Sequence, residues 1–390
     1  MNQTKLAQIY KKENLIGLLY GFCIFLLCDP YFTWESRRLN IYVSIVIFVI
    51  SLFYFRKLKT FDILVIPLFL FSFIYLYHNV NFYGFINKAI FLTFILLKEK
   101  QILIFIDSFK KIFIVSLFLS LIIYILVVIF FVPVSYNIIP PLNSLKPNNY
   151  VQYPFLVSES YMGFKYLNIR FCGMFDEPGV VGSIATILLF ADNYNLRKKQ
   201  NIILFVAGIV SFSFYFIISS IVYFLYLSNN KIRLLFISLF FLLFLMTRND
   251  VVVDYLVWDR FVIENGQIKG DNRSSEGLNA TFNQFMNGDE VIWGEGADYT
   301  TNNNLLSESS YKLLILNYGM VFFIIICLSF SLFAYYIIKD LKYVIEYLFL
   351  FYGMMYQRPG LVMNPSLYFI MIACIYAIKQ IAVNKTNFKT

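Results

Sequence analysis

The sequence predicts an all-α, polytopic integral membrane protein with about twelve transmembrane helices in a single transmembrane domain, residues 1–390. Two observations lead to this fold class. Of the 390 residues, 59% are hydrophobic and only 14% are charged, and the mean hydropathy is +0.69. The apolar residues form continuous runs without the alternation of barrel strands, so helices must satisfy the backbone in lipid. This composition excludes a soluble enzyme, a disordered chain and a disulfide-rich scaffold.

The spans are expected where the apolar runs lie. The first run, 14–27, follows three lysines and lacks a small-residue cleavage site, so it is expected to be a retained span. The run 201–227 could hold one span or two short ones, and the positive-inside rule favours two, with a turn near 211–215. Both termini and 20 of the 32 Lys and Arg residues then lie in short cytoplasmic segments. The other runs are 40–55, 61–77, 82–97, 112–134, 178–191, 234–247, 313–338, 343–356 and 361–378.

This topology leaves two large outer loops, residues 135–177 and 248–312. Seven of the twelve outer positive residues are arginines, against three of the twenty inner ones. A lysine suffices for topology, whereas the arginine fork grips phosphate oxygens bidentately. The outer face therefore indicates a phosphorylated substrate such as a lipid diphosphate, although each arginine could instead pair with a loop acid. The outer arginines are Arg37, Arg38, Arg170, Arg248, Arg260, Arg273 and Arg358.

The segment from Arg170 to Gly182 joins the first outer loop to the next predicted helix. Pro178 suits the first helical turn, where its missing N–H costs nothing. Asp176 and Glu177 then lie at the positive end of the helix dipole. The three charged residues form either a structural cap, with Arg170 as the counter-ion of the acids, or part of a functional site.

Two further motifs lie on the outer side. Gly294 and Gly296 precede Glu308, an acid at the outer mouth of the helix that follows. That carboxylate could act as a general base or simply complement the helix dipole. The second motif, 357–360, is a tight turn between the last two spans. A Pro-Gly turn needs no charge, so Arg358 in this turn favours a functional role.

Together, the motifs at 170–179, 294–311 and 357–359 resemble the O-antigen polymerase (Wzy-type) family, which is related to the O-antigen ligase superfamily. The resemblance covers roughly residues 160–365 and implies a GT-C-like glycosyltransferase that uses no metal or other cofactor. Such an enzyme sits in the bacterial inner membrane and joins undecaprenyl-diphosphate-linked oligosaccharide repeat units on the periplasmic face. The resemblance also implies a chain-length regulator protein as a partner. Nucleic acid is not expected as a partner, because the positive residues lie in short segments between spans, a pattern of membrane topology.

The donor already carries a good leaving group, so catalysis needs positioning and charge neutralisation. Two carboxylates are candidates for deprotonating the acceptor hydroxyl, Glu308 first and Glu177 failing it. The arginines expected to bind the diphosphate are Arg170, Arg248 and Arg273, with Arg260 and Arg358 as second choices.

Two other functions stay open. An O-antigen ligase normally places a histidine just before the span that follows the large loop, where this chain has Glu308; its single histidine, His78, lies in another outer turn. A lipid-linked oligosaccharide flippase or other transporter would explain the spans but not the two large loops. Ion-coupled transporters also carry buried ionisable groups, and here only Lys88 lies near the middle of a run.

Overall fold

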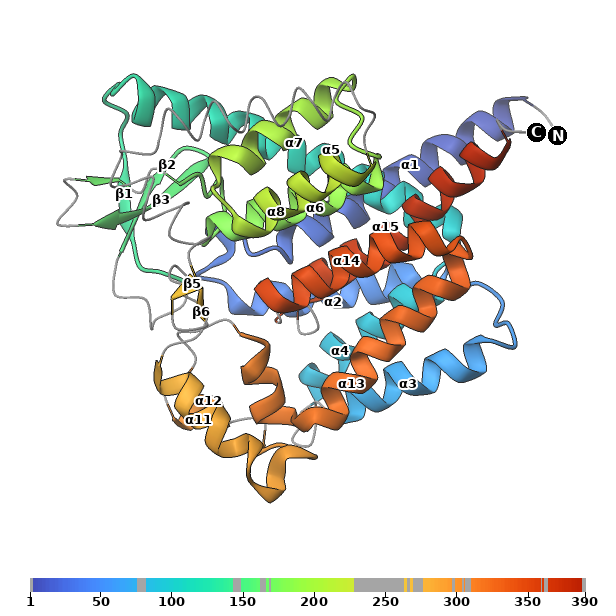
Figure 1. Cartoon of the computed structure of the whole chain (residues 1–390). Coiled ribbons are helices and arrows are strands. Elements are labelled where there is room, and N and C mark those ends of the chain that lie inside the picture. The colour runs from blue at the N-terminus through green and yellow to red at the C-terminus, as the bar shows by residue number, and fades with distance from the viewer. Residues whose placement is uncertain are drawn as a thin grey trace.

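The apolar runs of the sequence fold into helices that lie side by side in a bundle (Figure 1). The structure, a computed structural model, describes residues 3–75, 82–142, 149–161, 166–167, 170–227, 263–264, 267–268, 276–296, 299–303, 305, 310–358, 360 and 364–387. The helices of the first half are α1 (Gln3–Leu26), α2 (Arg37–Leu52), α3 (Asp62–Tyr75), α4 (Phe82–Leu96), α5 (Glu99–Tyr124), α6 (Pro178–Ala191) and α7 (Lys199–Val210). Those of the second half are α8 (Phe214–Val222), α11 (Glu276–Met286), α12 (Tyr299–Asn302), α13 (Tyr311–Ile338), α14 (Leu341–Gln357) and α15 (Pro365–Asn387). Short 3-10 or π segments are η1 (Tyr31–Thr33), η2 (Ile125–Ile129), η3 (Tyr223–Leu227) and η5 (Asp289–Val291).

The predicted span 112–134 corresponds to α5, which begins much earlier, at Glu99. Charged residues interrupt the apolar run before 112, so the sequence does not indicate a helix there. In the structure these charged residues are paired. Asp107 pairs with Lys111 one turn away at 2.6 Å, and Glu99 pairs with Lys379 of α15 at 2.5 Å. Because these charges are compensated, the polar stretch continues the helix. The sequence prediction of this boundary was therefore wrong.

Helix α15 is the centre of the bundle. It packs against α1, α4, α5, α6, α13 and α14, and every side chain in 367–376 is buried. A helix that is apolar around its whole circumference belongs in a core. The ring of Tyr368 anchors this core, with edge-on contacts to Phe91 at 4.8 Å and Phe330 at 5.1 Å between centroids.

Several helices keep an exposed apolar side. On α5 and η2, the side chains at 115, 118, 122 and 125 are each at least 39% exposed, and their spacing places them on one face. In the part of the chain that the structure describes, three helical segments are long and apolar enough to cross a membrane: Glu99–Val128, Tyr311–Ile338 and Pro365–Asn384. Exposed apolar faces on helices of this length suit contact with lipid. The fold is therefore that of a mostly helical protein compatible with a membrane; the total of about twelve spans stays a prediction.

The run 201–227 folds as a helical hairpin of α7 and α8, which continues into η3. The chain turns at Phe212, whose φ is 47°. The two ends of the hairpin away from the turn both contact the segment just after α6. The Asn201 side chain donates to the carbonyl of Asn195 at 2.9 Å, and the Tyr223 hydroxyl donates to that of Asn193 at 2.7 Å. The turn expected near 211–215 is thus confirmed.

The segment predicted as the first outer loop, 135–177, contains a small antiparallel sheet, which the all-α prediction does not include. Its strand order is β1-β2-β3-β4, and a separate pair, β5 and β6, lies within 248–312, the segment predicted as the second outer loop. The strands are β1 (Asn137–Ile139), β2 (Tyr150–Tyr153), β3 (Leu156–Tyr161), β4 (Tyr166–Leu167), β5 (Ile263–Glu264) and β6 (Gln267–Ile268). The N–H of Val157 donates to the carbonyl of Gly173 at 2.8 Å, and the Tyr150 hydroxyl to that of Asp176 at 2.6 Å. The sheet therefore fixes the segment that enters α6.

The sheet and the chain termini mark opposite ends of the bundle (Figure 1). We call them the sheet end and the terminus end. Helix α6 begins at the sheet end and α14 finishes there, so residues far apart in the sequence can meet.

Candidate active site

The first turn of α6 supplies one part of the candidate site. Glu177 is the N-cap residue, with φ −141° and ψ 141°, and Pro178 occupies the start of the helix. Proline at this position pre-sets the helical φ, and the carboxylate of Glu177 lies at the positive end of the helix dipole. The helix start expected from the sequence is confirmed.

Arg358 reaches this helix start from a position 181 residues further along the chain. It directly follows α14, and its backbone N–H donates to the carbonyl of Met354 at 2.6 Å. The Nη2 atom of Arg358 lies 2.5 Å from Oε2 of Glu177, and the two side chains are 15% and 36% exposed. Two candidate residues from separate sequence motifs therefore form one ion pair at a partly open surface.

Gly179 makes room for this ion pair. A Cβ atom built on Gly179 would lie only 2.4 Å from Nη2 of Arg358. The guanidinium thus lies directly over the first turn of α6, where a larger residue would displace it. Gly179 is therefore small for a steric reason: it leaves space for the guanidinium of Arg358.

Arg170 lies at the turn of the α7–α8 hairpin. Its Nε and Nη2 atoms donate to the carbonyls of Ser211 and Phe212 at 3.3 and 3.5 Å. The next residue, Phe171, donates its N–H to the carbonyl of Val210 at 3.0 Å. These bonds attach the segment before α6 to the hairpin turn, so Arg170 has a positioning role here in addition to its expected role in binding diphosphate.

The hairpin turn in turn packs on α6. A Cβ atom on Gly182 would lie 2.2 Å from Cβ of Ser213, so a glycine is required where the turn crosses the helix. The Ser211 hydroxyl donates to the carbonyl of Gly208 at 2.7 Å and closes the end of α7. The hairpin thus buttresses the helix whose first turn carries Glu177.

The start of α13 lies beside the end of α14. The hydroxyl of Ser310 caps α13 by accepting the N–H of Lys312 at 3.3 Å. The rings of Tyr311 and Tyr356 follow, with centroids 6.1 Å apart. Because Tyr356 is only two positions before Arg358, the end of the motif at 294–311 lies near the ion pair. The described parts of the three motifs, 170–179, 294–311 and 357–359, therefore meet at the sheet end.

The loop before α13 is locked onto a break in that helix. Gly319 interrupts α13 with φ 79° and ψ 169°. The carbonyl of Leu316, on the near side of the break, accepts the N–H of Glu295 at 2.8 Å. The two backbones are so close that a Cβ on Gly319 would lie 2.3 Å from the carbonyl oxygen of Ile292, and one on Gly294 would lie 2.5 Å from the nitrogen of Gly319. We call this contact the glycine clasp. It explains why the motif at 294–311 begins with a glycine, Gly294.

Asp29 is an acid at the sheet end that belongs to none of the three motifs. It follows α1, and its Oδ1 atom accepts Nδ2 of Asn40 at 2.8 Å. Tyr31, two residues on, donates its N–H to the carbonyl of Met174 at 2.8 Å, which ties this loop to the segment before α6. Burial raises the pKa of Asp29; the bond from Asn40 opposes this shift and the charge of Asp176 adds to it. The signal in the sequence is an Asp-Pro pair directly after an apolar run.

The Asp29→Asn variant is expected to remove a pH-dependent part of the stability. The folded-state pKa of Asp29 is raised, so its contribution is fully present below the unfolded value of about 3.9 and is lost as pH rises through the folded value. The unfolding midpoint of the wild type in detergent should therefore fall, relative to the variant, between pH of about 4 and neutrality. Glu35→Gln, at an exposed acid nearby, is the control. Parallel pH profiles for wild type and Asp29→Asn would contradict this expectation.

Several predicted positions lie outside the described residues. Among the expected site residues these are Glu308, Arg248, Arg260 and Arg273, and the apolar run 234–247 and His78 lie outside as well. Among the residues that are described, no group of three or more His, Cys, Asp or Glu side chains could hold a metal ion. The described part of the site consists of Glu177 and Arg358, with the start of α13 beside the end of α14 and Arg170 at the hairpin turn that packs on α6.

The fold and this site define a class of protein: a mostly helical chain with helices of membrane-spanning length and a carboxylate–guanidinium pair at one end. Comparison with known protein families, with curated proteins and with solved structures found no match.

Proposed function

We propose that the protein is a polymerase of O-antigen or a related surface polysaccharide. In this proposal it is a metal-independent membrane glycosyltransferase that joins undecaprenyl-diphosphate-linked repeat units at the sheet end, facing the periplasm. One observation carries the proposal: Glu177 and Arg358, from two separate motifs, are paired at 2.5 Å beside the start of α13, which follows Glu308. A guanidinium can neutralise diphosphate and a carboxylate can accept a proton, which are the two roles that this transfer requires.

The proposed orientation in the bacterial inner membrane has about twelve spans and both termini in the cytoplasm. It is supported by the grouping of lysine-bearing turns at the terminus end. Lys100 of α5 pairs with Glu13 of α1 at 2.7 Å, and Lys379 of α15 pairs with Glu99 at 2.5 Å. Among the described residues, Arg170 and Arg358 lie at the opposite, sheet end. The lysines at the terminus end are what the positive-inside rule expects of a cytoplasmic face.

The proposed reaction is a direct displacement at the anomeric carbon of the donor. The acceptor hydroxyl oxygen forms a bond to that carbon as the bond to the diphosphate breaks, and the hydroxyl proton goes to a carboxylate. Arg358 binds the leaving diphosphate and stabilises its negative charge. When diphosphate engages Arg358, it competes with Glu177 for the guanidinium, so substrate binding releases a carboxylate next to the reacting groups. Glu177 or Glu308 is then the general base.

The remaining outer arginines have two proposed roles. Arg170 holds the hairpin turn through carbonyls of Ser211 and Phe212, so it acts mainly by positioning α6. The proposed further ligands of the diphosphate are Arg248, Arg260 and Arg273. Several arginines suit this group, because each can bind phosphate oxygens bidentately and the diphosphate carries at least two negative charges.

A deletion strain tests the proposed function. Its surface lipopolysaccharide should show a single repeat unit on the core, and the wild-type gene should restore the ladder of longer chains. Complete absence of even one repeat would indicate a ligase or a flippase instead, and accumulation of long glycan on undecaprenyl diphosphate would identify the ligase. An unchanged ladder, with other surface glycans also unchanged, would reject the proposal.

The Gly179→Ala variant is expected to reduce chain elongation about tenfold with little loss of stability. The added methyl group displaces the guanidinium from Glu177, which weakens one charge-assisted interaction in the site. The flexible arginine can move aside, so the helices should remain packed. Elongation rate per mole of inserted protein and the unfolding midpoint in detergent measure the two effects. Gly360→Ala is the control, because no described atom lies within 4 Å of its added Cβ.

A further inference from the structure

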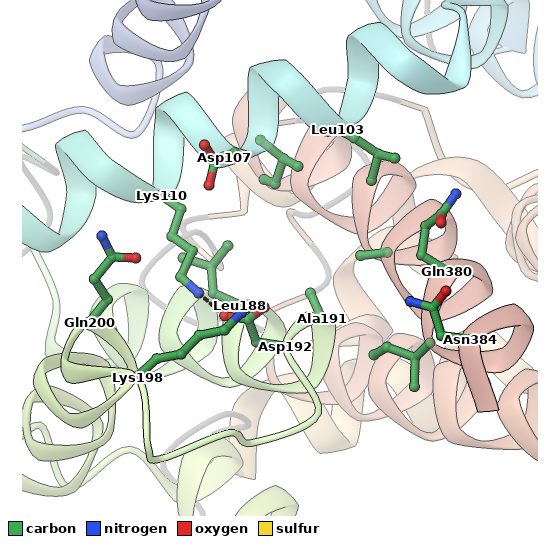
Figure 2. A pocket seen from close by; sticks show the side chains of 13 residues that line it. Leu103, Asp107, Lys110, Leu188, Ala191, Asp192, Lys198, Gln200, Gln380 and Asn384 are labelled. Carbon is green, nitrogen blue, oxygen red and sulfur yellow. Dashed lines mark hydrogen bonds and ion pairs between the residues drawn. The ribbon is translucent and has the colours of Figure 1, made fainter. Parts of the chain in front are cut away.

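A cavity lies at the terminus end of the bundle, far from the proposed active site. Helix α6 runs from Pro178, beside the Glu177–Arg358 pair, to Ala191 at the cavity, a distance of about 20 Å at 1.5 Å per residue. The cavity has a volume of about 400 Å³ and is lined by residues of α5, α6, α7 and α15 and of the turn between α6 and α7 (Figure 2). The proposed glycosyl transfer does not use it.

Two ammonium groups converge on one carboxylate in its wall (Figure 2). Lys198 Nζ lies 2.9 Å from Oδ1 of Asp192, and Nζ of Lys110 contacts Oδ2 of the same carboxylate. Lys110 is only 8% exposed and also donates to Oδ1 of Asn201 at 2.8 Å. Burial alone would raise the pKa of Asp192, but the bonds from both lysines hold it below its usual value. With two lysines and one ionised acid, the cluster carries one excess positive charge.

Uncharged hydrogen-bond donors lie beside the positively charged cluster. Helix α7 begins directly after Lys198, which makes no side-chain cap bond, so the positive pole of a 12-residue helix faces the cluster. The amide side chains of Gln200 and Asn384 line the cavity from different helices (Figure 2). The other acid of the wall, Asp107, is paired with Lys111 at 2.6 Å. The unbalanced charge is therefore positive, and several N–H donors surround it.

The rest of the wall is apolar. Helices α5, α6 and α15 contribute Leu103, Ile106, Leu188, Ala191, Ala377 and Ile381. A soluble anion would gain nothing from contact with this apolar surface. The glycerol and first methylenes of a lipid would bury it, which is favourable. The cavity also lies where apolar helices meet their lysine-bearing ends, the position at which basic pockets between helices bind anionic headgroups.

We propose that this cavity binds a phosphate group, carried by the headgroup of an anionic membrane phospholipid. Lys198 is half exposed, so it can turn from Asp192 toward the phosphate while Lys110 keeps the carboxylate paired. The helix start and the amides of Gln200 and Asn384 supply neutral donors. The proposal is independent of the polymerase activity, since it concerns the opposite end of α6.

Lipid binding to the full-length protein in nonionic detergent tests the site. Native mass spectrometry would compare short-chain phosphatidylglycerol with phosphatidylcholine of the same chain length, with and without inorganic phosphate as competitor. We expect phosphatidylglycerol to bind at least about fivefold more tightly, and Lys198→Gln to abolish that preference. Lys342→Gln is the matched control, because Lys342 is an exposed lysine at the start of α14, outside the cavity. Heat stability of Lys198→Gln would be measured alongside, to confirm that it folds.

Each outcome decides the proposal. A preference for phosphatidylglycerol that Lys198→Gln removes and Lys342→Gln retains supports a lipid phosphate. Strong competition by inorganic phosphate that depends on Lys198, without any preference between lipids, supports the phosphate site but assigns it to a soluble phosphate compound. Equal binding of both lipids with no phosphate competition overturns the site. Equal losses in both variants overturn it too, since bulk charge attraction would then explain the binding.

Discussion

The Arg358→Ala variant is expected to lose chain elongation by about 10²–10³-fold while inserting and folding normally. This is the range for removing one preorganised donor from a developing negative charge. Arg358→Lys keeps a charge but loses the bidentate fork, so it should recover only part of the activity. The measurement is the elongation rate on lipid-linked repeat units, per mole of purified protein. Arg38→Ala, at an exposed arginine at the start of α2, is the matched control and should keep wild-type activity.

A charge swap separates catalysis from simple structural pairing. The double variant Glu177→Arg, Arg358→Glu keeps an ion pair between α6 and α14 but exchanges the positions of the two charges. If the pair only held the helices together, the swap would restore activity lost in each single variant. We expect restored heat stability without restored elongation, because the guanidinium would no longer face the diphosphate. Wild-type elongation by the swap would remove Arg358 and Glu177 from the proposed mechanism.

The Gly319→Ala variant is expected to lower the free energy of unfolding by about 3 kcal/mol and to release the loop before α13. Two effects add. Alanine is strained at φ 79°, and its Cβ would lie 2.3 Å from the backbone oxygen of Ile292, which cannot move without breaking the glycine clasp. The loop should then become sensitive to proteolysis near Trp293. The unfolding midpoint in detergent and the rate of proteolytic cleavage measure these effects.

Two glycines of the loop before α13, Gly296 and Gly288, separate the effect of backbone strain from that of steric collision. Gly296 has φ 109° but no described atom within 4 Å of an added Cβ, so Gly296→Ala should cost only about 1 kcal/mol. Gly288 has φ −97° and an ordinary contact of 3.4 Å to the carbonyl of Phe285, so Gly288→Ala should be near wild type. The expected order of destabilisation is Gly319, then Gly296, then Gly288. Equal effects at all three positions would contradict a clasp at Gly319.

The secondary structure around the candidate site could largely be predicted from local sequence. Pro178 after two acids predicts a helix start, and the structure begins α6 there. The hairpin within 201–227 followed from charge distribution, since a single crossing would have placed many lysines outside. The early start of α5 was missed because its charges are balanced only by partners such as Lys379, 280 positions from Glu99. The sheet at 137–167 was missed because its strands are short and lie in a polar loop without clear alternation.

Composition and apolar runs determined the fold class and the positions of most helices, because burial of apolar surface and backbone hydrogen bonding act within each segment. The sequence also singled out Glu177 and Arg358, since helix caps and tight turns are local features. Only the tertiary structure decided that these two residues are partners, that Arg170 holds a hairpin turn, and that Gly294 and Gly319 clasp each other. Each of these contacts depends on how helices from distant parts of the chain cross. Such crossings are set by packing of many side chains together, which no single motif encodes.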